Sequence, residues 1–374
     1  MIEVETPGLV VDLDRTAANV ARTAAAAHAA GLTYFPHAKS HRSIELGQLQ
    51  LDNGADGLCL AKLGEAEDFA DALAREDRKL AIVVAYPIVG TQKARRALAL
   101  TDRVDLTVGT DSVAAAASVG EVFAAAGRRC RLFLAIDTGL GREGVPPADA
   151  AAVAVEIAAV PGVLLDGVYT HEGIVMGATD RDDLRERSLH AAEVMVDAAN
   201  AIRAAGVPIT EVSVGCSGSV DHLVNFPGLT QVRPGINTFG DLGQVALGNT
   251  DLDGVSVRVH TTVVSHAEPG RACIDAGTKS IGRDLVPAAA QADRYPGFGL
   301  LVNAPGWQVA KLSEEHGTLR WVGEGEPTPL PVGTRLDLVP NHVCVVFGSL
   351  RRWTGVRDGV VTGVYDCLPP GSSE

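Results

Sequence analysis

Between residues 9 and 240, short apolar runs alternate with alanine-rich stretches along the chain. The runs are rich in β-branched residues, which is typical of buried strands, whereas apolar positions in the stretches recur at steps of three and four, which indicates helices. We expect the first helix to begin at Asp14, as its N-cap, and to end before Gly31. The longest predicted helix spans residues 181–205, with one face formed by Leu184, Ser188, Ala191, Met195, Ala198 and Ile202. The expected strands lie at residues 34–39, 56–61, 80–86, 103–109, 131–137, 164–171, 211–216 and 230–235.

Eight strands that alternate with helices predict an α/β fold in which parallel strands close into a (β/α)8 TIM-type barrel. A doubly wound open sheet is the alternative, but the even spacing of the eight units favours closure. We expect this barrel to occupy residues 8–242.

The pattern changes after about residue 242, where strand-like runs follow one another without helices and glycines and prolines separate them. This pattern predicts a second, smaller antiparallel β domain over residues 243–374, which residues 1–7 are expected to join. Its expected strands lie at residues 255–268, 271–277, 299–303, 307–322, 334–340, 343–349 and 359–367.

The net charge of the chain is −14, from 46 acidic and 32 basic residues. Such a balance argues against nucleic acid or an anionic membrane as a partner. The six cysteines are scattered, the N-terminus "MIEVETPGLV" has no features of a signal peptide, and no apolar run is long enough to span a bilayer. We therefore expect a cytoplasmic protein with reduced thiols.

Candidate chemistry lies where the expected barrel strands end, because a barrel carries its functional residues at the C-terminal ends of its strands. Lys39 ends the first strand, Arg142 follows the fifth and Tyr169 ends the sixth, while "GCSGS" (215–219) follows the seventh and "RPGINTFGD" (233–241) the eighth. A lysine there can form a Schiff base with a carbonyl, and a Gly/Ser loop offers backbone amides and a hydroxyl to phosphate. Together these features suggest pyridoxal phosphate, although a lone lysine is more often a solvated surface residue and such a loop can be a simple turn.

Several motifs occur in order along nearly the whole chain: "TPGLVVDLDRTAANV" (6–20), "PHAKSHRS" (36–43), "GADGLCLAKLGEAE" (54–67), "DTGLGREGV" (137–145), "YTHEG" (169–173), "RPG…FGD" (233–241), "IDAGTKSIGRD" (274–284), "SEEHG" (313–317) and "VPNHVC" (339–344). With these motifs the sequence resembles the D-serine dehydratase and D-threonine aldolase family, a branch of the alanine racemase-type (fold-type III) pyridoxal phosphate enzymes. "PHAKSH" with a distant "PNHVC" is the specific pair, whereas "DTGLGR" alone would be weak.

The resemblance implies a pyridoxal phosphate barrel with a β domain, usually as a homodimer, that acts on a small D-amino acid. It implies that Lys39 is the Schiff-base lysine, that Arg142 lies near the cofactor ring and that Tyr169 lines the cofactor pocket. Gly215, Ser217 and Gly218 fall where the family places its phosphate loop, and His342 and Cys344 match its metal pair.

The pair His342 and Cys344 also allows an argument from the residues themselves. Side chains two apart on a strand point to the same face, so both could contact one ion. Imidazole and thiolate suit zinc better than magnesium, although manganese or magnesium remains an alternative. Two protein ligands leave positions for water and substrate, as a catalytic site requires. Without the resemblance, a cysteine here is more often a small buried apolar residue.

The sequence departs from the family close to this site. Many members have a tyrosine shortly after "RPG", where this chain has Asn237 among Ile236, Thr238 and Phe239. We expect Asn237 to contact the cofactor in a different way. The loop "GCSGS" likewise has Ser217 and Gly218 where members often have Thr-Pro, so both departures bear on the substrate rather than on the cofactor.

The predicted function is a lyase that acts on D-3-hydroxy-2-amino acids, with dehydration of a D-serine- or D-threonine-like substrate to a keto acid and ammonia favoured. The His/Cys pair supports this choice, because the family's aldolases more often pair His with Asp. D-threonine-type aldol cleavage to glycine and an aldehyde is the first alternative. An amino-acid racemase would need a second acid/base from the β domain, where only Tyr295 and Tyr365 are available and neither lies in a matching motif. A non-catalytic cofactor carrier is the last alternative.

Overall fold

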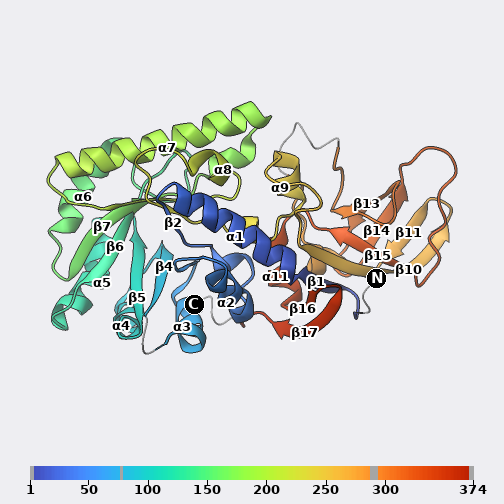
Figure 1. The fold of residues 1–374 in the computed structure, drawn as a ribbon, viewed down its shortest axis with the longest axis horizontal. Coiled ribbons are helices and arrows are strands. Elements are labelled where there is room, and N and C mark those ends of the chain that lie inside the picture. The colour runs from blue at the N-terminus through green and yellow to red at the C-terminus, as the bar shows by residue number, and fades with distance from the viewer. Residues whose placement is uncertain (1–3, 76–78, 287–293, 370–374) are drawn as a thin grey trace.

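The computed structural model of the protein describes residues 4–75, 79–286 and 294–369. Two parts lie side by side in it (Figure 1): a ring of strands with helices around it, and a second β domain. The first and the last strand in sequence, β1 and β17, both belong to the second domain. Helix α1 (Leu13–Ala29) runs from the junction of the two parts along the first of them.

The first part is a parallel sheet of eight strands in the order β2-β9-β8-β7-β6-β5-β4-β3. A parallel bridge between His37 and Cys59 joins the two outer strands, and the Cys59 amide donates to the carbonyl of Pro36 at 3.0 Å, so the sheet closes into a barrel. The predicted (β/α)8 barrel is confirmed. The strands are β2 (Thr33–Tyr34), β3 (Leu58–Leu60), β4 (Leu80–Pro87), β5 (Val104–Thr110), β6 (Cys130–Ala135), β7 (Val163–Tyr169), β8 (Glu211–Val214) and β9 (Gln231–Val232).

Helices surround the barrel because each has an apolar face that packs on the outward side chains of the strands. The predicted long helix is α7 (Arg181–Ala204), and the six residues assigned to its inner face are all buried. The other elements of this part are η1 (Ala38–Ser40), α2 (Ile44–Asp52), α3 (Leu63–Leu73), α4 (Thr91–Leu100), α5 (Val113–Ala125), η2 (Pro147–Asp149), α6 (Ala150–Ala158), η3 (Gly173–Gly177), α8 (Val220–Leu223), η4 (Ile236–Thr238) and α9 (Leu242–Leu247).

Side chains fill the interior of the barrel rather than leaving a pore. A separate apolar cluster consists of Phe35, Cys59, Val83, Phe133, Ala135 and Tyr169, which come from five of the eight strands or their ends. A filled interior forces any ligand to bind above it, at the mouth where the strands end.

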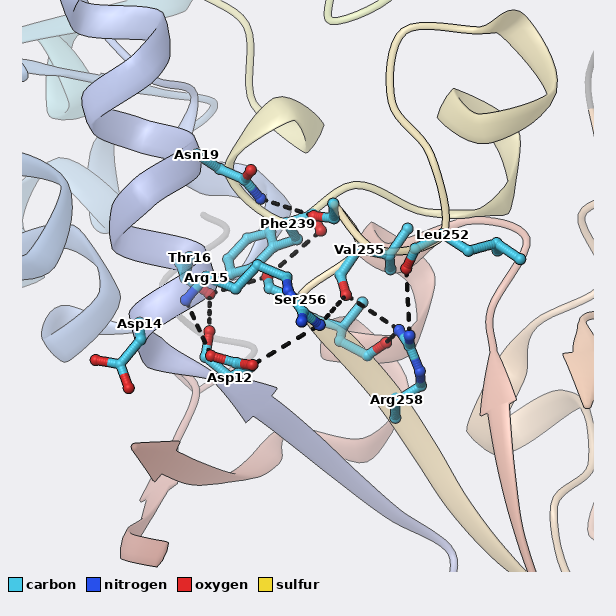
Figure 2. Close-up of polar contacts among 12 residues, drawn as sticks. Asp12, Asp14, Arg15, Thr16, Asn19, Phe239, Leu252, Val255, Ser256 and Arg258 are labelled. Carbon is cyan, nitrogen blue, oxygen red and sulfur yellow. Dashed lines mark hydrogen bonds and ion pairs between the residues drawn. The ribbon is translucent and has the colours of Figure 1, made fainter. Parts of the chain in front are cut away.

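The junction between the two parts is a network of polar contacts at the start of α1 (Figure 2). Asp12 caps the helix by accepting from the Arg15 amide at 2.9 Å, so the cap lies two residues before the predicted Asp14. Thr16 donates to Ser256 at 2.9 Å. Asn19 donates to the carbonyl of Gly254 at 2.9 Å. These contacts hold the entrance of the first helix against the chain segment that leaves the barrel.

The second part is a sheet with the main order β13-β14-β11-β10-β1-β16-β17, in which β15 pairs with β10 and β12. Most pairs are antiparallel as expected, but β1 and β16 are parallel, so the sheet is mixed. Its elements are β1 (Gly8–Asp12), β10 (Val257–Glu268), β11 (Arg271–Ile274), α10 (Thr278–Ile281), β12 (Leu300–Leu301), β13 (Trp307–Leu312), β14 (Gly317–Trp321), β15 (Arg335–Val339), α11 (Val343–Leu350), β16 (Arg352–Arg357) and β17 (Val360–Asp366). Residues 8–12, which the sequence pattern had assigned to the barrel, therefore lie in this sheet.

The predicted strand at residues 343–349 is wrong, because this segment is helix α11. Its buried residues Val343, Val346 and Phe347 are spaced by three and one, which is the pattern of a helix face. A short apolar run does not distinguish a strand from a buried helix by its periodicity, and the β-branched composition favoured the strand. Strand β16, which follows at once, was not predicted.

Among the described residues, no helix is both long and apolar enough to cross a membrane.

Candidate active site

Lys39 lies in the 3₁₀ turn η1, five residues after the end of the first barrel strand, and its side chain is exposed. The predicted strand over residues 34–39 is shorter than expected, since β2 ends at Tyr34. The neighbouring His37 is buried and donates through Nδ1 to the carbonyl of Cys59 at 3.1 Å. Burial, and then the positive charge of Lys39, hold the pKa of His37 well below its usual range, so the ring beside the lysine is neutral.

A cavity of about 510 Å³ opens beside Lys39, between the barrel mouth and helix α11. Cys344, Phe347 and Arg351 line its other side, so the predicted lysine and one of the two predicted metal ligands share one space. Its volume lies in the range of small-molecule sites. A larger cavity of about 970 Å³ lies between the N-terminal segment and strands β16 and β17, and none of the predicted site residues lines it.

A buried aromatic cluster joins the lysine turn to helix α11. The ring of His41 contacts Phe239 and Phe347 edge-on, with centroid distances of 5.6 and 6.3 Å. His41 also bonds Gln50 at 3.3 Å, and Gln50 donates to Thr238 at 3.0 Å. Burial lowers the pKa of His41 to about 4, so its ring is neutral at physiological pH. The cluster fixes the turn that carries Lys39 relative to the β domain.

The loop Gly215–Ser219 follows β8, as predicted, and is buried. Two consecutive residues at the end of the neighbouring strand β7 hold it. His171 donates through Nδ1 to the carbonyl of Gly215 at 2.8 Å, and Glu172 accepts from the amide of Gly215 at 2.8 Å and bonds the hydroxyl of Ser219 at 3.1 Å. Burial lowers the pKa of His171 to about 4, and the charges of Lys39 and other cations add to this effect.

Ser217 and Asn237 connect this loop to the turn after β9. The hydroxyl of Ser217 accepts from the amides of Gly235 at 3.1 Å and Asn237 at 3.2 Å. The side-chain nitrogen of Asn237 donates to Thr23 at 2.9 Å and Tyr34 at 3.2 Å, whereas its buried Oδ1 has no partner among the described residues. The side-chain donors of Asn237 are therefore already occupied, and its backbone is the part that borders the loop.

Arg233 is a buried cation at the centre of the barrel mouth that sequence analysis did not single out. Its Nε donates to the hydroxyl of Ser213 at 2.6 Å and its Nη2 to the carbonyl of Thr170 at 2.6 Å, and its guanidinium lies 5.4 Å from the ring centre of Tyr169. All of these partners are neutral, so the described residues leave the charge of Arg233 without an ion pair. The signal in the sequence was the arginine of "RPG", a charged residue directly after a buried strand.

Tyr169 ends β7 and Arg142 lies in the segment after β6, and the two side chains have different environments. Tyr169 is buried, burial raises its pKa, and its hydroxyl has no hydrogen-bond partner among the described residues. Gly109 makes room for this hydroxyl, because a Cβ at that position would lie 2.4 Å from it. Arg142 is exposed and pairs with Glu143 at 2.7 Å, and its charge contributes to the low pKa of His171.

His342 and Cys344 lie at the N-terminus of α11 rather than on a strand. His342 is the N-cap residue with extended backbone angles (φ −142°, ψ 105°), which lets its side chain meet that of Cys344. The hydrogen bond to Cys344 raises the pKa of His342 to about 10, although burial acts against it. On the ring's other side, Nδ1 of His342 contacts the carboxylate of Asp284, and buried Asp241 accepts from the amide of Val343 at 3.1 Å.

The described residues contain no group of three or more His, Cys, Asp or Glu side chains arranged to hold a metal ion. Any ion here would therefore have the two side chains of His342 and Cys344 as its protein ligands, with Asp284 behind the imidazole. Hydrogen bonding of a ligand histidine to a carboxylate is a common way to orient the ring.

Comparison with known proteins relates each part of the chain to a family. Residues 11–243 match the model of the alanine racemase N-terminal domain, and residues 256–356 match that of a putative serine dehydratase domain. The chain belongs to the alanine racemase N-terminal domain family. The family predicted from the sequence motifs is thus confirmed.

Relatives of this family match over almost the whole chain. D-threo-3-hydroxyaspartate dehydratase from Delftia sp. (strain HT23) is 33% identical, over 96% of this chain and 97% of its own. D-threonine aldolase from Arthrobacter sp. is 29% identical, over 100% of this chain and 94% of its own.

A solved structure of the same fold carries information on a metal. It is a cysteine-to-alanine mutant of D-threo-3-hydroxyaspartate dehydratase "in the metal-free form", with a TM-score of 0.87 and 30% identity, over 98% of each chain. A histidine-to-alanine mutant of that enzyme, substituted two positions earlier, has a TM-score of 0.88 and 30% identity, over 98% of this chain and 95% of its own. The two substituted residues have the same types and the same spacing as His342 and Cys344.

Proposed function

We propose that this protein is a pyridoxal phosphate- and metal-dependent lyase that dehydrates D-3-hydroxy-2-amino acids to a keto acid and ammonia. The observation that carries the proposal is the shared cavity, in which Lys39 faces Cys344 across a space of about 510 Å³. The amine that would bind the cofactor and the thiol that would bind the metal thus line one cavity.

The residues at the barrel mouth suit the cofactor. The loop Gly215–Ser219 has glycines at positions 215 and 218, where the backbone without a side chain can approach a phosphate closely. The unpaired guanidinium of Arg233 and the unpartnered hydroxyl of Tyr169 offer polar contacts beside it. Lys39 would hold the cofactor through Nζ, with Arg142 on the exposed rim.

Imidazole and thiolate as the donor set of His342 and Cys344 suit a zinc ion better than magnesium or manganese. The ion would act as a Lewis acid on the β-hydroxyl of the substrate. Asp284 would hold His342 through Nδ1 and leave Nε2 for the ion. The mutants of the dehydratase relative support a metal role for this pair of residue types.

Within this arrangement, the pyridoxal ring would serve as the electron sink that makes the Cα–H bond of the substrate acidic. Nζ of Lys39, once the substrate amine has taken its place, would accept the Cα proton of the substrate. The charge of Lys39 contributes to the low pKa of both His37 and His171, and these neutral rings add no positive charge near its amine. His342 and Cys344 hold the site at which the β-hydroxyl leaves, and hydrolysis of the eliminated product yields the keto acid and ammonia.

Aldol cleavage is the second candidate, because the same residues serve it and D-threonine aldolase is among the relatives. The cysteine at position 344 and the dehydratase relative favour dehydration. A racemase is less well supported: Tyr365 stacks on Trp353 at 4.4 Å, and neither Tyr365 nor Tyr295 lines the cavity beside Lys39.

Product identification separates these candidates. The purified protein with pyridoxal phosphate and zinc is incubated with D-serine, D-threonine and D-threo-3-hydroxyaspartate, and keto acid, ammonia, glycine and aldehyde are measured. We expect keto acid and ammonia in equal amounts. Glycine with an aldehyde would assign the aldolase reaction, and an L-amino acid as sole product would assign a racemase.

The homodimer and the cytoplasmic location expected from the family resemblance and the sequence stay part of this proposal. Light scattering of the cofactor-loaded protein tests the first, with a mass of twice 38.8 kDa expected.

A further inference from the structure

Glu172 is a buried acid for which the proposed reaction has no use. Its side chain has no exposed surface, and it follows the end of β7 by three residues. One carboxyl oxygen accepts from the amide of Gly215 at 2.8 Å, and the other bonds the hydroxyl of Ser219 at 3.1 Å. The carboxyl group thus spans the loop Gly215–Ser219 from its first residue to its last.

A buried carboxyl group is costly unless its surroundings compensate for the lost hydration. Among the described residues Glu172 forms no ion pair. Burial raises its pKa, which favours the uncharged form, while the bond from Gly215 and the charge of nearby Arg233 act in the opposite direction. Its two hydrogen bonds to the loop are the contacts that compensate for the lost hydration.

The contacts on the two sides of Gly215 form a pair. His171 holds its carbonyl at 2.8 Å while Glu172 holds its amide, so the peptide units around Gly215 cannot rotate without breaking one of the two bonds. Ser217, in the middle of the loop, borders the turn after β9 through its bonds to two amides.

We propose that Glu172 is a positioning residue that holds the backbone of Gly215–Ser219 in the conformation that receives the cofactor phosphate. The inference rests on the proposed function, because it takes this loop to be the phosphate site. Glu172 contacts neither substrate nor cofactor in this account and acts through Gly215 and Ser219.

The test compares the affinities of pyridoxal phosphate and pyridoxal, which differ only in the phosphate. The apoprotein is titrated with each compound, and the dissociation constant is measured from the visible absorbance of the lysine adduct. The quantity of interest is the preference for pyridoxal phosphate, which is the ratio of the two dissociation constants. A change in general folding or in Lys39 alters both constants alike and leaves this ratio unchanged.

Three variants are compared with the wild type. Glu172→Ala removes both bonds, Glu172→Gln keeps an acceptor for the Gly215 amide, and Ser219→Ala removes only the second bond. Glu65→Gln is the control for loss of a buried acid elsewhere, because Glu65 is equally buried and accepts from the amides of Ala61 at 2.9 Å and Lys62 at 3.3 Å after β3, although it also pairs with Arg42 at 2.8 Å.

We expect Glu172→Ala to lower the preference for pyridoxal phosphate about tenfold, the effect of losing a buried hydrogen-bond partner. Glu172→Gln should restore most of it, Ser219→Ala should lower it by a smaller factor, and Glu65→Gln should leave it unchanged. If Glu172→Ala does not fold, the decrease in Ser219→Ala alone supports the inference.

An unchanged preference in the folded Glu172 variants, or in Ser219→Ala if Glu172→Ala does not fold, would overturn the inference and leave the proposed function intact. A wild type that binds both compounds equally would instead overturn the phosphate assignment of the loop, and with it the inference.

Discussion

The barrel side and the sheet side of the proposed site are built from different kinds of structure. On the barrel side, Lys39, Tyr169 and the loop Gly215–Ser219 come together because parallel strands all end at one mouth. On the sheet side, His342 and Cys344 meet because one is the extended N-cap of helix α11 and the other lies in its first turn. The first arrangement follows from topology, whereas the second depends on the backbone angles of a single residue.

This difference explains which functional residues can be located from the sequence pattern. Any residue directly after a barrel strand is brought to the mouth whatever the loop conformation. A pair at spacing two meets on a strand but does not share a face within a helix. The prediction that His342 and Cys344 lie together therefore relied on a strand that does not exist, and the proximity comes instead from the helix cap.

The largest expected effect comes from a substitution on the barrel side. Lys39→Ala removes the amine proposed both to bind the cofactor and to accept the Cα proton, so turnover should fall by about a thousandfold or more. Visible absorbance of the lysine adduct should disappear. Lys62→Ala is the control, since Lys62 is also on the rim but packs on the ring of Tyr86 at 3.5 Å. Retained absorbance in Lys39→Ala would refute the assignment.

The next largest effect comes from substitutions on the sheet side, which should leave the barrel side intact. His342→Ala and Cys344→Ala should lose the bound metal and lower the rate of keto acid formation by about a hundredfold, because the leaving hydroxyl loses its Lewis acid. Absorbance of the lysine adduct should stay, in contrast to Lys39→Ala. Cys367→Ala is the matched control, because this thiol lines the same cavity. Metal content by elemental analysis is the measurement, and full metal content in either variant contradicts the pair.

Arg233→Lys tests how much the buried guanidinium contributes to the stability of the barrel mouth. The substitution keeps the charge but loses the forked bonds to Ser213 and Thr170, so the free energy of unfolding should fall by about 2 kcal/mol. Urea denaturation of the apoprotein measures it. Arg131→Lys, at the half-exposed ion pair with Asp166, should cost less than about 1 kcal/mol. Equal effects of the two substitutions would argue against a special role for the buried guanidinium.

Asp284→Asn tests whether Asp284 orients the imidazole of His342 for the metal. An amide accepts a hydrogen bond from His342 less strongly than a carboxylate does, so the affinity for zinc should fall about tenfold while the ligands remain. Competition with a chromogenic chelator gives the dissociation constant. An affinity equal to that of the wild type would show that Asp284 does not orient the imidazole.

The smallest effect concerns the cluster that joins the two sides. Burial lowers the pKa of His41 to about 4, below the value of about 6.5 in an unfolded chain. As the pH falls, the unfolded state therefore binds the proton before the folded state does. The contribution of neutral His41 to the free energy of unfolding is complete above pH 6.5 and is lost as the pH falls toward 4. Between pH 7 and pH 5.5 it amounts to about 1 kcal/mol. Replacing His41 by Gln should reduce the pH dependence of unfolding by that amount, and an identical slope in both proteins would contradict it.

Much of the barrel side could be predicted from the sequence. The alternation of apolar runs identified the strands, and the rule on strand ends then located Lys39, Tyr169 and the Gly/Ser loop. Arg233 and Glu172 were missed because their partners lie far away in sequence: Ser213 and Thr170 for the first, Gly215 and Ser219 for the second. A composition-based pattern does not show that a charged residue is buried, or which neutral groups surround it.

The sheet side was less predictable for two physical reasons. The apolar run after His342 is too short for its period to be read, and its valines favour a strand over the helix that forms. The long-range pairing of β1 with β10 and β16 also gives no local signal, so residues 8–12 could not be separated from the helix that follows them.

Removal and return of the metal in the wild-type protein shows whether Lys39 and the pair His342 and Cys344 work at one site. The cofactor-loaded protein is treated with a chelator, and lysine-adduct absorbance and keto acid formation from D-3-hydroxy amino acids are followed together. The account predicts that the absorbance stays, that keto acid formation stops, and that zinc restores it. Undiminished keto acid formation by protein shown to be free of metal would contradict the claim that Lys39 and the pair His342 and Cys344 work at one site.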